Sequence, residues 1–138
     1  MKKRKIKAIV EKGKDERFSI YSKDHFGNSY FGGFGASVAA AKEDFLKSVK
    51  EAIEEEQTES NAVYSIDNIV IEYSYDIPSF FNFFDFINVS RFAEYAGVNE
   101  SKMRAYKSGV SFPGEKTTAK IFRAIRKIGA ELTAATLL

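Results

Sequence analysis

The chain has 138 residues, enough for one ordinary domain or two small ones. Hydrophobic residues make up 44% of it and aromatic residues 14%, so we expect a buried core rather than disorder. It contains no cysteine, which excludes disulfides and thiolate metal sites. No apolar run reaches the length of a membrane span, and the segment after the basic start is too short and too charged for a signal peptide. We therefore expect a cytoplasmic protein.

The net charge of +2 divides unevenly along the chain. Residues 87–138 carry nine Lys or Arg against four Glu, a balance of +5. Residues 1–86 hold the other 12 basic and 15 acidic residues, a balance of −3. A basic segment joined to a mildly acidic one is typical of a nucleic-acid-binding module attached to a different domain.

The first third of the chain carries strand signals. Ile6, Ala8 and Val10 alternate with charged residues, and Phe18 and Ile20 alternate in the same way beyond a polar turn at 13–16. This pattern predicts a β-hairpin. Residues 30–35 predict a third strand that its glycines weaken.

A long helix and a fourth strand complete the expected first domain. Ser37 is a suitable N-cap for a helix over residues 38–56, and residues 57–67 are polar enough to form a loop. Apolar side chains then alternate again over 69–75. The order β-β-β-α-β predicts a small α+β domain over residues 1–77, with the helix on one face of the sheet.

Residues 78–138 are expected to form an all-α second domain. Pro78 suits the start of a short helix that continues through the aromatic run to Ile87, and Asn88 suits the N-cap of the next. Ser108-Gly109 predicts a helix end, and a last helix is expected from about residue 115. We expect that last helix to bury five apolar side chains: Ile121, Phe122, Ile125, Ile128 and Leu132.

The stretch from Phe92 to Tyr106 reads as a helix-turn-helix. Ala93 is the small residue that two closely crossing helices require, and Gly97 allows a turn with positive φ. Five apolar residues have the spacing of the packed interior: Phe92, Ala96, Val98, Met103 and Tyr106. An ordinary helical hairpin is the alternative, since it also favours Ala and Gly near a tight turn.

This interpretation predicts a DNA-contacting surface. Arg104 would make a bidentate contact with guanine and Glu100 would accept a hydrogen bond from cytosine. The residues expected at base edges are Glu100, Ser101, Arg104 and Ala105. Those expected at phosphates are Asn88, Arg91, Asn99, Lys102 and Lys107. Helix-turn-helix domains of this kind read two half-sites one helical turn apart, so we expect a homodimer.

Taken together, the two halves resemble the HicB antitoxin family. Residues 88–132 are similar to Cro-like helix-turn-helix domains in Phe92-Ala93, Ala96-Gly97-Val98, Met103, Tyr106 and the Gly109…Pro113 spacing. The first half resembles the degenerate RNase H-like fold of the family in its hairpin, its loop around Asp24, Gly32-Gly33 and the helix start at Ser37. The chain departs from the family in three places. It lacks prolines in Lys23-Asp24-His25-Phe26, has Gly33-Phe34-Gly35-Ala36-Ser37 at the strand-helix junction, and has Val89 in place of glutamine.

The resemblance implies a function. The protein would be an antitoxin that binds and neutralises a small basic HicA-like ribonuclease toxin. It would also repress its own operon by binding double-stranded operator DNA. A stand-alone transcriptional regulator without a toxin is the alternative.

A less favoured alternative is an active RNase H-like nuclease, which would need several carboxylates at one place. The spacing does not force the candidates together: Glu11, Asp15, Glu16, Asp24, Asp67, Glu72 and Asp76. We therefore do not expect an enzyme. His25 is the only histidine, so we expect no metal site. The glycines at 32–35 lack the spacing of a dinucleotide fingerprint and suit close strand packing, so we expect no cofactor.

Overall fold

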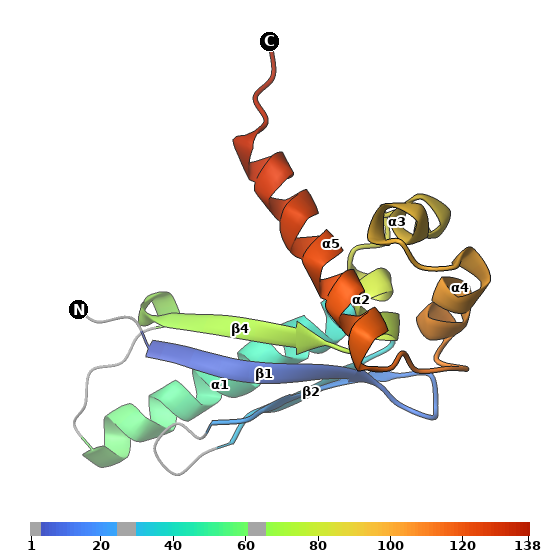
Figure 1. The fold of residues 1–138 in the computed structure, drawn as a ribbon. Helices are drawn as coiled ribbons and strands as arrows, with labels where there is room; N and C mark the ends of the chain where they lie inside the picture. The colour runs from blue at the N-terminus through green and yellow to red at the C-terminus, as the bar shows by residue number, and fades with distance from the viewer. Residues whose placement is uncertain (1–3, 25–29, 61–65) are drawn as a thin grey trace. The chain divides into compact units, whose positions relative to one another are not determined.

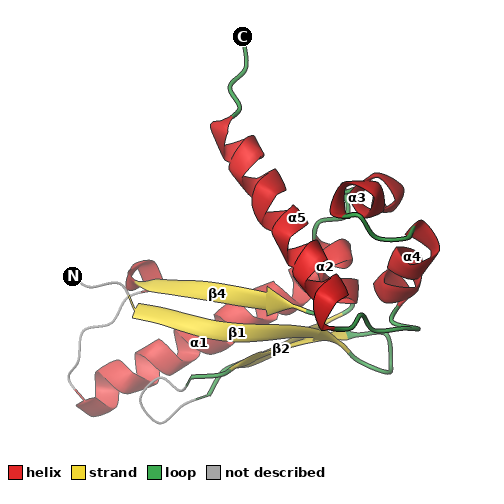
Figure 2. Cartoon of the chain, viewed as in Figure 1, coloured by secondary structure: helices red, strands yellow, loops and turns green. Residues whose placement is uncertain are grey.

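The computed structural model describes residues 4–24, 30–60 and 66–138, which combine a four-stranded sheet with helices (Figures 1 and 2). His25 lies outside the described residues, as do residues 61–65 of the predicted loop. The chain divides into two compact units, Met1–Phe83 and Phe84–Leu138. The mixed α and β composition expected from the sequence is confirmed.

The first unit is built on a sheet with strand order β3-β2-β1-β4. Its strands are β1 (Arg4–Lys12), β2 (Phe18–Ser22), β3 (Gly32–Gly35) and β4 (Ile69–Tyr75), which confirms the predicted strands. β1 runs antiparallel to β2, with Val10 opposite Ile20. β4 returns to the other side of β1 and runs parallel to it, with Ile71 opposite Ile6.

Helix α1 (Val38–Ser60) packs against this sheet. Its N-terminus is capped as predicted, because the Oγ of Ser37 accepts a hydrogen bond from the N–H of Ala40 at 3.1 Å. The predicted end at residue 56 is wrong, since the helix continues to Ser60. A 3-10 helix, η1 (Ile66–Asn68), occupies the end of the predicted loop. The core between helix and sheet consists of Ile6, Ala8, Val10, Phe18, Ile20, Phe31, Val38, Ala41, Phe45, Val49, Ala52 and Ile53.

The outer edge of β3 is hydrogen-bonded to α1. The N–H of Phe34 donates to the Asp44 carboxylate at 2.9 Å, and the N–H of Gly32 donates to the Ser48 hydroxyl at 3.4 Å. Side chains of the helix therefore satisfy backbone donors that an edge strand would otherwise leave open to another chain.

Helix α2 (Ile77–Phe83) ends the first unit. Asp76 fixes its start: one carboxylate oxygen accepts from the N–H of Ser79 and the other from the N–H of Lys12, both at 2.8 Å. The helix was expected to run to residue 87, but it stops at Phe83. It contacts β1, β4 and α1, so it packs within the first unit.

The second unit contains α3 (Val89–Ala96), α4 (Glu100–Ser108) and α5 (Glu115–Ala134). The buried side chains of these helices are Val89, Phe92, Ala93, Met103, Tyr106, Ile121 and Ala124. Of the five α5 side chains that we expected to be buried, only Ile121 is. Ile125 and Ile128 are partly buried, whereas Phe122 is 54% and Leu132 66% exposed. Among the helices of this unit α5 packs mainly against α3, and a helix of 8 residues cannot cover the apolar side chains along the 20 residues of α5.

Candidate nucleic-acid interface

Helices α3 and α4 are joined by the tight turn that the sequence predicts. Gly97 adopts the left-handed conformation with φ 72°. The N–H of Val98 donates to the carbonyl of Ala93 at 2.9 Å, which closes the end of α3. Ala93 and Met103 are both buried. The positive φ expected at Gly97 is therefore confirmed.

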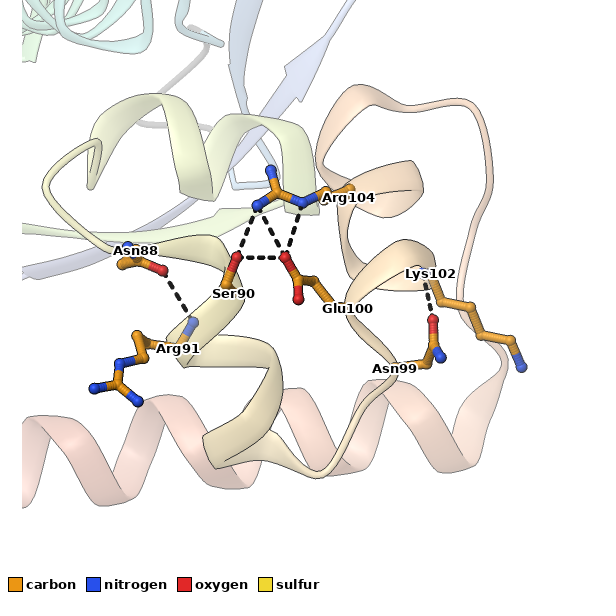
Figure 3. Close-up of polar contacts among 7 residues, drawn as sticks. All are labelled: Asn88, Ser90, Arg91, Asn99, Glu100, Lys102 and Arg104. Carbon is orange, nitrogen blue, oxygen red and sulfur yellow. Dashed lines mark hydrogen bonds and ion pairs between the residues drawn. The ribbon is translucent and has the colours of Figure 1, made fainter.

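An asparagine caps the N-terminus of each helix (Figure 3). The side-chain oxygen of Asn88 accepts from the N–H of Arg91 at 3.0 Å, and that of Asn99 accepts from the N–H of Lys102 at 3.1 Å. The predicted cap at Asn88 is confirmed. Both residues were also expected to contact phosphate, and with their oxygens engaged in capping they would do so through their amide nitrogens. The positive ends of the helix dipoles favour an anion at these positions.

Arg104 is held in a network that joins the two helices (Figure 3). Its Nη2 lies 3.0 Å from Oε1 of Glu100 and 2.7 Å from Oγ of Ser90, and its Nε lies 3.3 Å from the same Glu100 oxygen. Ser90 donates its hydroxyl proton to Glu100 at 2.5 Å. These hydrogen bonds, first from Ser90 and then from Arg104, lower the pKa of the Glu100 carboxyl. Glu100, predicted to contact a base, is thus bound to Arg104.

Ser90 is the member of this network that the sequence did not suggest. It lies in the first turn of α3, ten positions before Glu100 and fourteen before Arg104. The hydrogen bonds of Ser90 join the start of α3 to α4, so a short polar residue in the first turn of α3 was the available signal.

The other predicted contact residues lie on the same pair of helices. Ser101, Lys102 and Lys107 are exposed on α4, whereas Ala105 is only partly exposed. Arg91 is exposed on α3 and lies 3.6 Å from the Glu94 carboxylate. An exposed ion pair of this kind is weak, so it would exchange readily for a phosphate.

The acidic residues of the first unit have separate roles. Asp76 caps α2, Glu11 accepts from the Tyr21 hydroxyl at 3.1 Å, and Glu72 pairs with Lys5 at 2.5 Å. The remaining candidates are dispersed as well: Asp15 accepts from the backbone of Arg17, Asp24 from that of Lys7, Glu16 lies in the turn, and Asp67 lies in η1. Across 4–24, 30–60 and 66–138, no three His, Asp or Glu residues gather as a metal site.

A second feature missed from the sequence is a lysine among aromatic rings in the first unit. The Nζ of Lys42 lies 3.3 Å from the ring centre of Phe83 and 4.2 Å from that of Tyr73. It also donates to the Tyr75 hydroxyl at 2.6 Å. Burial lowers the pKa of Lys42 to about 8, although the faces of the surrounding rings favour the charged ammonium.

Comparison of the chain with protein-family models, with curated proteins and with solved structures gives no match. Within the described residues, none of the helices combines the length and apolar character needed to cross a membrane.

Proposed function

We propose that this protein is a DNA-binding autorepressor and antitoxin of the HicB type. Its second unit would bind operator DNA, and its first unit, read as a degenerate RNase H-like fold, would bind a small basic HicA-like ribonuclease toxin. The protein would act in the cytoplasm and would not itself be an enzyme. Both halves of this proposal depend on the resemblance, but the DNA-binding half has the more direct physical support.

The observation that carries it is the geometry of α3 and α4. A glycine in the left-handed region separates two short helices that are each capped by asparagine, and the start of the second helix presents exposed polar side chains. An arginine held on this surface is suited to the edge of a base pair in the major groove, and the capped helix ends are suited to phosphates.

The proposal includes a homodimer, since two half-sites require two copies of the motif. The apolar side chains left exposed on α5, Phe122 and Leu132, offer a surface that a second copy would cover. Replacing Leu132 by Glu would then weaken dimerisation and operator binding together. Sedimentation at several concentrations would measure the first, and a titration of operator DNA the second.

The proposed toxin-binding role of the first unit is supported by its β-β-β-α-β order and by the mild acidity of residues 1–86. Copurification of the tagged protein from its native cells, followed by mass spectrometry, tests this role. We expect to recover a small basic protein in stoichiometric amount. This protein should cleave RNA when it is isolated and should lose that activity in the complex. If the protein is recovered without a partner but still binds its own promoter, the stand-alone regulator is the better interpretation.

The DNA-binding role is tested by titrating a labelled duplex from the promoter of the gene, with a scrambled duplex as the reference. We expect preferential binding to the promoter and an affinity that falls steeply with salt, because contacts to phosphates release counterions. Arg104→Ala should abolish the preference and leave weak salt-sensitive binding. An unchanged preference in that variant would remove Arg104 from the base-reading role.

A further inference from the structure

We propose that Ser90 and Glu100 are positioning residues that hold Arg104 so that its outer edge reads N7 and O6 of a guanine. This inference rests on the proposed DNA binding and deepens it. It assigns Ser90 a role in recognition and moves Glu100 from base contact to support of the arginine (Figure 3).

The first argument is the side of the guanidinium that is already used. Each hydrogen bond that the described residues make to Arg104 involves Nε or Nη2, and Nη1 points away from Ser90 and Glu100 (Figure 3). Oε1 of Glu100 and Oγ of Ser90 lie only 2.5 Å apart on this side of the guanidinium, so both face the same N–H of Nη2 and share it. The opposite edge, formed by Nη1 and the outward N–H of Nη2, is retained. Those donors match the two acceptors that guanine presents in the major groove.

The second argument is the charge of the pair. A phosphate-binding arginine gains most of its affinity from its net positive charge. Here the Glu100 carboxylate lies 3.0 Å from Nη2 and neutralises much of that charge. The direction of the remaining N–H groups is unaffected. The pair therefore keeps the oriented donors that select a base, but loses electrostatic attraction for the phosphate backbone of DNA. Guanine therefore fits this arginine better than a phosphate does.

The third argument concerns Glu100 itself. Its Oε1 accepts hydrogen bonds from the Ser90 hydroxyl and from both Nε and Nη2 of Arg104. A hydrogen bond from the amino group of cytosine to Glu100 would compete with these three hydrogen bonds. The Ser90 hydroxyl is bonded on both sides, donating to Glu100 and accepting from Arg104. It thus restricts the arginine before DNA arrives, which reduces the conformational entropy lost on binding.

The inference predicts an atom-specific loss of affinity. Each guanine of the operator duplex would be replaced in turn by 7-deazaguanine, which lacks the N7 acceptor, and binding followed by fluorescence anisotropy. We expect one guanine in each half-site at which the replacement weakens wild-type binding roughly tenfold. Arg104→Ala should bind both duplexes equally. Ser90→Ala should lose most of the tenfold difference, whereas Ser90→Thr, which keeps the hydroxyl, should restore it.

The controls separate recognition from folding. Ser111→Ala changes an exposed serine just beyond α4 and should give the wild-type profile. Equal thermal unfolding midpoints for the Ser90 variants would show that the helices remain intact.

Two results would show that the inference is wrong while the proposed function stands. Ser90→Ala could keep the full wild-type sensitivity to 7-deazaguanine, or no guanine could be sensitive in a duplex that is still bound preferentially. The loss of affinity in Arg104→Ala could instead depend on a DNA phosphate, shown by replacing that phosphate with methylphosphonate, and not on N7 of guanine. Arg104 would then be a phosphate contact, and the inference would again be wrong. If no promoter preference exists, the proposed DNA-binding function fails first and the inference falls with it.

Discussion

A Cβ atom placed on Gly33 would lie 2.5 Å from the backbone nitrogen of Phe45, so β3 and α1 meet without a side chain between them. The backbone of a core helix cannot withdraw from such a contact without disturbing the Phe45 ring beneath it. We expect Gly33→Ala to lower the free energy of unfolding by on the order of 3 kcal/mol. Urea denaturation followed by far-ultraviolet circular dichroism would measure the change.

Gly32 is the matched control for this prediction. It is the neighbouring residue of the same strand, but the nearest atom to an added Cβ there is the Ile20 carbonyl oxygen at 3.7 Å, an ordinary contact. Gly32→Ala should therefore change stability by less than about 1 kcal/mol. Equal effects at the two positions would mean that strand propensity, and not contact with α1, determines the cost.

The turn of the second unit offers a test of backbone conformation without steric interference. A Cβ would meet nothing within 4 Å at either Gly97 or Gly129, but Gly97 has φ 72° whereas Gly129 lies within α5. Gly97→Ala should destabilise the protein by about 1 kcal/mol through left-handed strain, and Gly129→Ala should stabilise it by roughly 0.5–1 kcal/mol through helix propensity. Thermal unfolding would compare them. A loss of stability in both variants would point to contacts made in an assembly instead.

Lys42 predicts a dependence of stability on alkaline pH. Burial lowers its pKa from 10.5 to about 8, so between these values the unfolded chain binds more protons than the folded one. Stability should then rise with pH from 8 towards 10, by on the order of 1 kcal/mol after allowance for its partial exposure. Above pH 10 the trend reverses, because burial raises the pKa of Tyr75 to about 12 and unfolded tyrosine releases its proton first.

Lys42→Met tests this expectation by keeping the length of the side chain and removing the titrating amine. The variant should lose the rise between pH 8 and 10, while Lys47→Met, a change at an exposed position of the same helix, should retain it. Urea midpoints from circular dichroism suit the measurement, since the chain has no tryptophan and alkaline pH alters tyrosine fluorescence. If stability still rises between pH 8 and 10 in Lys42→Met, another titrating group causes the rise.

Asp76 should behave as a structural residue and not as a catalytic one. Asp76→Ala removes the acceptor for both Ser79 and Lys12, and we expect a loss of roughly 2–3 kcal/mol. Asp76→Asn retains one acceptor oxygen and should lose about half as much. Chemical denaturation distinguishes the two. A metal-dependent nuclease activity removed by Asp76→Asn at unchanged stability would instead favour the nuclease alternative.

Regular patterns made most of the fold predictable. Alternation identified β1, β2 and β4, and Ser37 and Asn88 identified the starts of α1 and α3, because each depends on residues close together in the chain. The end of α1 was missed because a run of glutamates suits a helix interior as well as a solvated end. The membership of α2 in the first unit depends on contacts with distant strands, which no local pattern contains.

The candidate site was predictable as a motif but not as a network. The positions of Ala93 and Gly97 follow from the steric requirements of the turn. The i,i+4 spacing of Glu100 and Arg104 also favours an ion pair, which we did not infer from the sequence. The link of this pair to Ser90 depends on how another helix packs. The cluster around Lys42 was missed for the same reason, since its rings come from β4 and α2. Exposed Phe122 was taken for core because periodicity identifies an apolar face without revealing how much of it a neighbour covers.

The parallel pairing of β1 with β4 has a consequence for the order in which the first unit assembles. Asp76 binds the backbone of Lys12 across 64 positions of sequence, and β4 is the neighbour that covers one side of β1. During synthesis, β1, β2 and β3 emerge well before β4, so β1 remains an open, apolar strand edge for that interval. Because such long-range parallel pairing forms slowly, the growing chain is most exposed to association with other chains before its last strand arrives.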